Sequence, residues 1–158
     1  MGIIIGSTNI VSTTATVQAA AYSANDVVGG LITLTGVCVS ALDRPTGIIH
    51  SVVITDKAAQ DVDYDVVFFD TNPSNTTFTE NSALTLSDTD LPTIVGVAQV
   101  TTHVAFSASG VNILHGANIP FRITDTSTNA IYACIITRGA PTYASTSDVT
   151  LRVGILQD

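Results

Sequence analysis

The sequence contains no tryptophan, one lysine (Lys57) and one glutamate (Glu80). Only 11% of its residues are charged. Because exposed helices are usually rich in Glu and Lys, this near absence argues against long surface helices. Five Lys and Arg residues against thirteen Asp and Glu residues give a net charge of -8, and the arginines do not cluster. Direct binding to nucleic acid or to an anionic membrane is therefore not expected.

Cysteines and long apolar runs are also scarce. Cys38 and Cys134 each lie in an apolar run rich in β-branched residues, where a free cysteine behaves as a small core residue. We expect two unpaired buried thiols, with one disulfide as the alternative. The longest strongly apolar uncharged run, residues 27–42, is short for a membrane span and contains three glycines. No basic stretch precedes an apolar run at the N-terminus, so a secretory leader is not expected.

What the chain does contain favours β-structure. Hydrophobic residues make up 46% of its 158 residues, and Val, Ile and Thr recur throughout. We predict an all-β fold, a two-sheet antiparallel sandwich of jelly-roll type, with about eight strands and at most one short helical turn. Residues 1–9 are predicted to be an N-terminal arm, and residues 10–158 a single β-sandwich domain.

Residues 47–73 are predicted to be the central element, a hairpin of two long strands joined by a short polar turn. In the first strand, Ile48 and Ile54 share one face while Ile49 and Thr55 share the other. The second strand begins with alternating aspartates, predicted to face water, and becomes apolar on both faces at residues 67–69. A hairpin cannot cover its own apolar face, so the remaining strands must supply a second layer.

The other strands are predicted from runs of β-branched residues between turn residues. These strands are residues 10–18, 27–40, 94–108, 111–114, 120–124, 130–137 and 149–156. Gly29 and Gly30 predict a bulge in the second of them. Residues 130–137 are uniformly apolar, which places them at the centre of a sheet. Residues 70–83 are predicted to be a long surface loop, and Ser87 is predicted to cap one helical turn.

One cluster of acidic residues is a candidate metal site. Asp61, Asp63 and Asp65, with Asp70 nearby, could offer carboxylate oxygens to calcium. The spacing does not fit an EF-hand loop, because Val66 and Asn72 occupy its required Gly and Glu positions. We therefore expect a solvated strand face, with no metal and no cofactor.

Catalysis is not expected either. His50, His103 and His115 could pair with Ser and Asp residues in a hydrolytic triad, but the sequence has no G-x-S-x-G motif. Gly29 and Gly30 precede β-branched residues and not a helix start, so no phosphate-binding loop is predicted. The Asn75-Thr76-Thr77 triplet matches the glycosylation pattern, which we interpret as a chance match. The chain is accordingly predicted not to be an enzyme.

Low charge and a mean hydropathy of +0.44 predict that apolar surface remains after folding, for which a partner protein is the natural cover. Tyr143 and Phe78 lie among small polar residues in two loops. They are candidates for contact with that partner, with simple anchoring of the loops as the alternative.

Three stretches together resemble small structural proteins of tailed bacteriophage virions. They are AYSANDVVGG (residues 21–30), VVFFDTNPSNTTFTENSALTLSDTDL (66–91) and RGAPTYASTSDVTLRVGIL (138–156). The size and β-rich composition are similar to those of capsid decoration, or cement, proteins. This resemblance implies a homo-oligomer, most often a trimer, on the outer surface of the virion where copies of the major capsid protein meet. It also implies synthesis in the cytoplasm of a bacterial host.

Three alternatives remain open. A tail-fibre tip or lectin-like carbohydrate-binding module would have the same strands and hydroxyl-rich loops, although the lack of tryptophan counts against it. A neck or tail-tube component is the second alternative, and a virion-associated hydrolase is the third. In each structural role, the uncharged arm of residues 1–9 is the first candidate for a segment that orders against a partner.

Overall fold

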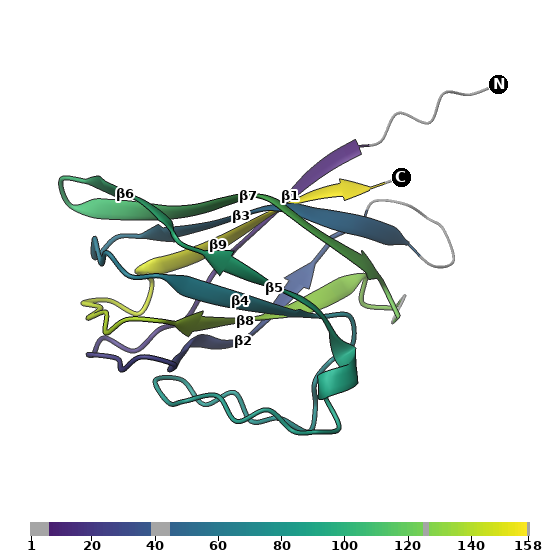
Figure 1. The fold of residues 1–158 in the computed structure, drawn as a ribbon, viewed down its shortest axis with the longest axis horizontal. Coiled ribbons are helices and arrows are strands. Elements are labelled where there is room, and N and C mark those ends of the chain that lie inside the picture. The colour runs from purple at the N-terminus through teal and green to yellow at the C-terminus, as the bar shows by residue number, and fades with distance from the viewer. Residues whose placement is uncertain (1–6, 39–44, 125–126, 158) are drawn as a thin grey trace.

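The computed structural model describes residues 7–38, 45–124 and 127–157. These residues form two antiparallel sheets that pack face to face (Figure 1). The strands are β1 (Ser7–Thr14), β2 (Val27–Thr35), β3 (Thr46–Asp56), β4 (Tyr64–Phe69), β5 (Ile94–Val100), β6 (Thr102–Phe106), β7 (Ser109–Arg122), β8 (Ala130–Thr137) and β9 (Val149–Gln157). No helix in these ranges is long and apolar enough to cross a membrane.

The strand order is that of a jelly roll. One sheet has the order β1-β9-β3-β7-β6 and the other β2-β8-β4-β5. Apart from the β4–β5 and β6–β7 connections, each link along the chain crosses from one sheet to the other, which brings the first and last strands side by side. The predicted all-β sandwich is confirmed. The bulge at Gly29 and Gly30 is also confirmed, since the β2–β8 register shifts between Val28 and Leu31.

The predicted central hairpin is wrong, because β3 and β4 lie in different sheets. β3 pairs with β7 and β9, whereas β4 pairs with β5 and β8. The link between them turns away at Asp56, whose carboxylate accepts hydrogen bonds of 2.7 Å from the backbone N–H groups of Ala58 and Gln60. Alternation identified the two strands, but it does not specify which strand pairs with which.

The buried carboxylate of Asp56 predicts a pH effect. Burial raises the pKa of Asp56 above its ordinary value of 3.8, and Asp148 raises it further, while the two backbone hydrogen bonds lower it. The folded state therefore binds this proton more tightly than the unfolded state, so the Asp56 contribution to stability grows as the pH falls. We expect the free energy of unfolding of the natural protein, relative to Asp56→Asn, to rise between about pH 7 and about pH 4. Denaturant titrations across that range test this, and a constant or shrinking difference would contradict it.

Other predicted boundaries also differ from the structure. The two strands predicted at residues 111–114 and 120–124 are one strand, β7. Residues 7–9, assigned to the arm, are the first residues of β1 and pair with β9, so the sandwich begins before residue 10. Residues 1–6 of the arm lie outside the described residues. The single strand predicted over residues 94–108 is two strands, β5 and β6, which separate at Thr101 and enter different sheets.

One helical turn is present, as predicted, but it lies later in the chain. It is the 3-10 turn Leu91–Thr93, with Asp90 and not Ser87 at its cap and a proline at its start. Proline is favoured there because the first N–H of a helix has no partner within it.

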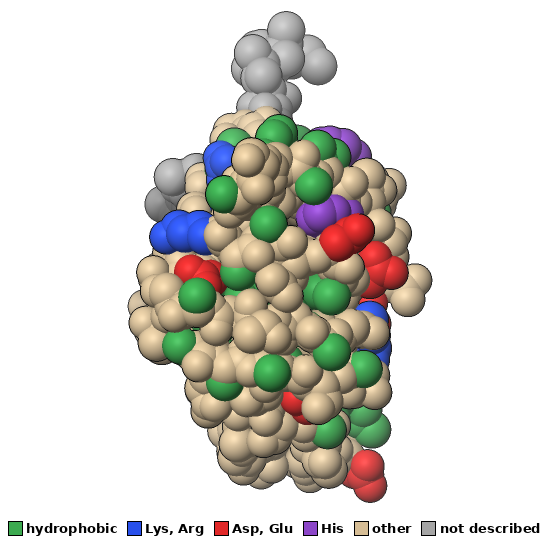
Figure 2. Space-filling model, turned by 90° about the vertical axis from the view of Figure 1, so that its left-hand side faces the viewer, with side chains coloured by type: hydrophobic (Ala, Val, Ile, Leu, Met, Phe, Trp, Pro, Cys, Tyr) green, Lys and Arg blue, Asp and Glu red, His purple; other side chains and the backbone are tan. Residues whose placement is uncertain are grey.

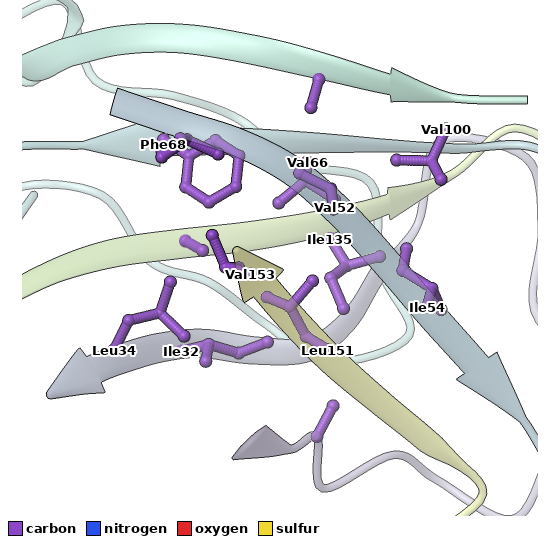
Figure 3. Packing of buried hydrophobic residues seen from close by; sticks show 14 of the residues in the cluster. Ile32, Leu34, Val52, Ile54, Val66, Phe68, Val100, Ile135, Leu151 and Val153 are labelled. Atoms are coloured by element: carbon purple, nitrogen blue, oxygen red, sulfur yellow. The ribbon is translucent and has the colours of Figure 1, made fainter. Parts of the chain in front are cut away.

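The main core lies between the two sheets. Alternate residues of β3 and β9, such as Val52, Ile54 and Leu151, meet Val66 and Phe68 of β4 across the interface (Figure 3). Phe68 has no exposed surface, and all eight residues of β8 are buried. The predicted core positions at residues 67–69 and 130–137 are therefore confirmed.

A second cluster lies on the opposite side of the four-stranded sheet. It joins Val27, Val67, Phe69, Tyr132, Cys134 and Ile136 of the sheet with the loop residues Phe78, Leu84 and Leu86. The Phe78 ring meets the Phe69 ring edge to face, with centroids 5.9 Å apart. The loop of residues 70–93 thus covers the outer face of this sheet, as Figure 1 also shows. This cover explains why β4 and β8 are apolar on both faces.

Both cysteines are buried and unpaired, as expected. Burial raises the pKa of Cys134 to about 12, with a further contribution from Glu80, and burial also raises the pKa of Cys38. Because the thiolate is the reactive form, both groups are inert at neutral pH.

Candidate functional site

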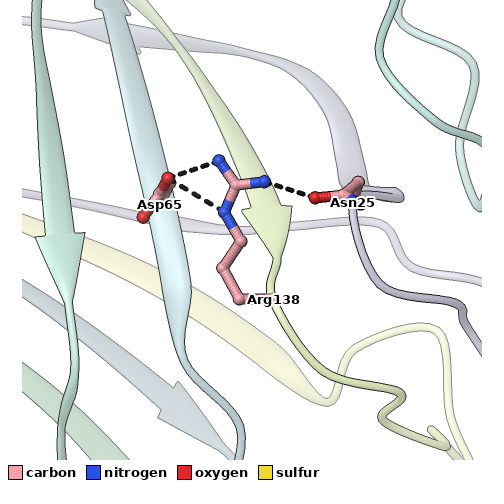
Figure 4. A network of polar contacts seen from close by, with 3 residues as sticks. All are labelled: Asn25, Asp65 and Arg138. Carbon is pink, nitrogen blue, oxygen red and sulfur yellow. Dashed lines mark hydrogen bonds and ion pairs between the residues drawn. The ribbon is translucent and has the colours of Figure 1, made fainter.

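The aspartates of the candidate metal site do not converge on one point. Asp61 pairs with His103 Nδ1 at 2.9 Å, whereas Asp63 is exposed. Asp65 was predicted to face water but is 6% exposed, and it accepts hydrogen bonds from Arg138, whose guanidinium also reaches Asn25 (Figure 4). In residues 7–38, 45–124 and 127–157, no three His, Cys, Asp or Glu side chains are close enough to share a metal ion.

The histidines lie at different places on the five-stranded sheet. His50 and His115 are exposed on β3 and β7, and His103 is largely buried on β6. His115 lies opposite Ser51 in the sheet, but no carboxylate occupies an outward position on these strands. Figure 2 views the end of the molecule with the β6–β7 hairpin, where histidine and acidic side chains lie together on a mainly uncharged surface.

The loop residues weighed as partner contacts anchor their loops. Tyr143 is 2% exposed, and its hydroxyl hydrogen-bonds the Tyr64 hydroxyl at 2.8 Å. Burial raises the pKa of both hydroxyls. Phe78 packs on Phe69. Tyr143 and Phe78 therefore both fit the anchoring alternative. The amide of Asn75 donates to Asp90, within the same loop.

The outer face of the five-stranded sheet is left without a cover by the residues that the structure describes. We define it by the outward residues of its strands, which alternate with buried ones. In β9, for example, Val149, Leu151, Val153 and Ile155 have no exposed surface. The register aligns the outward residues in rows across the sheet. One row is Ser12, Arg152, Val53, Ile113 and Thr102, and another is Thr14, Thr150, Thr55, Val111 and Val104.

This outer face combines exposed hydrophobic side chains with hydroxyl groups, and its outward positions include no acidic residue. Five of the seven large hydrophobic residues most exposed in the described chain occupy outward positions here: Ile10, Ile48, Val104, Phe106 and Leu156, between 41% and 59% exposed. Its charged residues are Arg122 and Arg152, although the whole chain has a net charge of -8. The acidic residues are thus kept off this one surface.

Two depressions mark the outer face. The larger has a volume of about 510 Å³ and lies at the end of the sheet where β1 begins. It is lined by Thr46, Gly47, Ile48, Pro120, Phe121, Leu156 and Gln157. The smaller, about 130 Å³, lies between Ile10, Val53 and Arg152. Such depressions are places where projecting side chains of a partner can pack.

The outer face also has the size of a stable protein interface. Five strands spaced about 4.8 Å apart, each about nine residues long, span about 24 Å by 30 Å, or about 700 Å². A standard protein complex buries about 800 Å² on each partner. This surface was hard to predict from the sequence for two reasons. The sequence does not give the strand register that aligns its residues, and it does not show that the loop of residues 70–93 covers the other sheet. The outward apolar positions of β9 and β3 were visible as alternation.

No known protein family matches this chain, and no curated protein is significantly similar to it in sequence.

Proposed function

We propose that this protein is a structural component of a bacteriophage virion, a decoration or cement protein that binds the outer surface of the assembled capsid. The observation that carries the proposal is the outer face, which no described segment covers, which holds five of the seven most exposed large hydrophobic residues of the described chain, and which is free of acidic residues and large enough for a stable interface. The jelly-roll topology supports it, since this fold recurs in viral capsid proteins. The resemblance of three stretches to virion proteins points in the same direction.

In this role the protein acts by binding. Its outer face contacts neighbouring copies of the major capsid protein, and a homo-oligomer, most often a trimer, bridges them. A ligand that binds only the assembled state stabilises that state by mass action, so the occupied capsid resists heat and dissociation. The two arginines of the outer face suit an acidic or hydroxyl-rich capsid surface.

Capsid binding tests the proposal with two matched variants. Ile10→Asp places a charge on the outer face, where Ile10 is 59% exposed, and Val97→Asp places one on the opposite sheet, where Val97 is 47% exposed. Because the change replaces an exposed apolar side chain of the proposed interface by a carboxylate that must be desolvated there, we expect Ile10→Asp to weaken binding to capsids lacking the protein by at least about tenfold. Val97→Asp should bind as the natural protein does. Equal binding by all three, or none by the natural protein, would overturn the decoration role and favour a neck or tail component.

A second candidate function rests on a different surface. A groove of about 430 Å³ in the loop of residues 70–93 is lined by Asn75, Thr77, Thr79, Thr85 and Ser87, with Ala83 and Leu86. Hydroxyl and amide groups in a groove are suited to hydrogen bonding with a carbohydrate, as a tail-fibre or receptor-binding module requires. Glycan-array binding that is lost in Thr77→Val and kept in Ile10→Asp would favour this function over capsid decoration.

A further inference from the structure

The larger depression of the outer face, which we call the end groove, opens beside the start of β1. Ser7 of β1 lies opposite Gln157 of β9, which lies opposite Gly47 of β3, and Gly47 lies opposite Phe121 of β7. Three of these four residues line the end groove. The segment that precedes Ser7 therefore joins the sheet at the end where this groove lies.

The end groove is suited to an apolar chain segment. Ile48 and Leu156 project into it and are each 41% exposed, while Pro120 and Phe121 extend its lining onto β7. The residues before Ser7 are Met-Gly-Ile-Ile-Ile-Gly, which have no side-chain charge and include three consecutive isoleucines. Burial of isoleucine side chains in the groove removes apolar surface from water, which favours binding.

The length of this segment fits the groove. Six residues in an extended conformation span about 20 Å, at about 3.3 Å per residue. The groove crosses β9, β3 and β7, and the distance from β1 to β7 is about 14 Å at about 4.8 Å per strand. The segment is therefore long enough to cross the whole groove.

The direction of β1 favours a groove on another copy. Ser7 lies at the end of the sheet where Gln157 lies, so a segment that continues the line of β1 leads away from its own end groove, which runs across the strands. A second copy whose groove faces this end can receive such a segment without a change of direction. We propose that residues 1–6 of one copy lie in the end groove of a second copy.

This inference rests on the homo-oligomer in the proposed function and names the contact that forms it. Each copy gives one segment and receives one. Two copies can do this by reciprocal exchange in a symmetric dimer, and three or more copies can do it in a closed head-to-tail ring, of which the trimer is the smallest.

Removal of residues 1–6 is the first test. The described sandwich does not include them, so the shortened protein should keep its unfolding midpoint as a monomer. We expect light scattering to show the natural protein as an oligomer and the shortened protein as a monomer at the same concentration. A natural protein that is already monomeric, or a shortened one that keeps its oligomeric mass, would overturn the proposal.

Cross-linking is the second test. It distinguishes binding of the segment in the end groove of a second copy from binding in the end groove of its own copy. Ile4→Cys and Ile48→Cys are made in separate chains and mixed under mild oxidation, with Val97→Cys replacing Ile48→Cys as the control. The natural cysteines are buried, so they do not compete. A disulfide-linked pair formed with Ile48→Cys and not with Val97→Cys supports the proposal. The proposal is overturned if the mixture gives no linked pair while a chain carrying both changes forms an internal disulfide. That result would place the segment in the groove of its own copy.

The two proposals can fail separately. Cross-linking through Ile48→Cys with no binding to capsids would refute decoration and leave the segment exchange standing. Capsid binding that survives removal of residues 1–6, by a protein that is monomeric with and without them, would refute the exchange alone.

Discussion

Replacement of Phe68 by alanine is expected to lower the free energy of unfolding by about 3–5 kcal/mol. Phe68 is the penultimate residue of β4, a strand that lies between β5 and β8, and it has no exposed surface. Its ring fills space between the two sheets (Figure 3), so its removal loses the burial of the ring and leaves a cavity that the flanking strands cannot close. Denaturant titration followed by circular dichroism measures the change.

Phe106→Ala is the matched control, because Phe106 is 58% exposed at the β6–β7 hairpin. A surface substitution of this kind should change the free energy of unfolding by no more than about 0.5 kcal/mol. A loss below about 1 kcal/mol for Phe68→Ala would mean that the space between the sheets is not packed as described.

Replacement of Glu80 by glutamine is expected to lower the free energy of unfolding by about 2–3 kcal/mol. One carboxylate oxygen accepts hydrogen bonds from the backbone N–H groups of Gly29 and Gly30, at 2.9 Å for Gly30, and the other accepts one from the Tyr22 hydroxyl. Both glycines have positive φ angles, +85° and +66°, which turn their N–H groups to the same side and form a small anion-binding nest. An amide nitrogen at this place would face an N–H donor.

Hydrogen exchange at the Gly29 and Gly30 amides reports this change directly, and faster exchange is expected with the loss of stability. Asp88→Asn is the control, since Asp88 is an exposed acid of the same loop and its change should cost no more than about 0.5 kcal/mol. Equal stability of the two variants would show that Glu80 does not hold the loop on the sheet.

Strands were predictable where burial imposes a pattern. β9 alternates and β8 is apolar throughout, and both were found within a residue of their bounds. Pairing was not predictable, because the partners of β3 are β7 and β9, far away in sequence. Two apolar strands joined by a polar link look alike whether they form a hairpin or cross between sheets.

Loop anchoring was also hidden in the sequence. The Tyr143 hydroxyl meets Tyr64, a residue 79 positions away, so a tyrosine among small polar residues looked like a surface contact. Glu80 was missed for the same reason, since its donors belong to a distant bulge. The only visible signal was its place as the sole glutamate of the chain, in a loop of Asn, Thr and Ser.

The pairing of Ser7 with Gln157 also determines how the molecule responds to force. β1 and β9 are antiparallel neighbours, and the outer ends of both strands lie at the same end of the sheet. A pull applied through residues 7 and 157 therefore loads the Ser7–Gln157 pair first and then each following pair in turn. The hydrogen-bonded pairs of β1 and β9 therefore break one after another, and β1 separates from the sheet at low force. A shearing load, which strains all pairs together, would require attachment at opposite ends of the two strands.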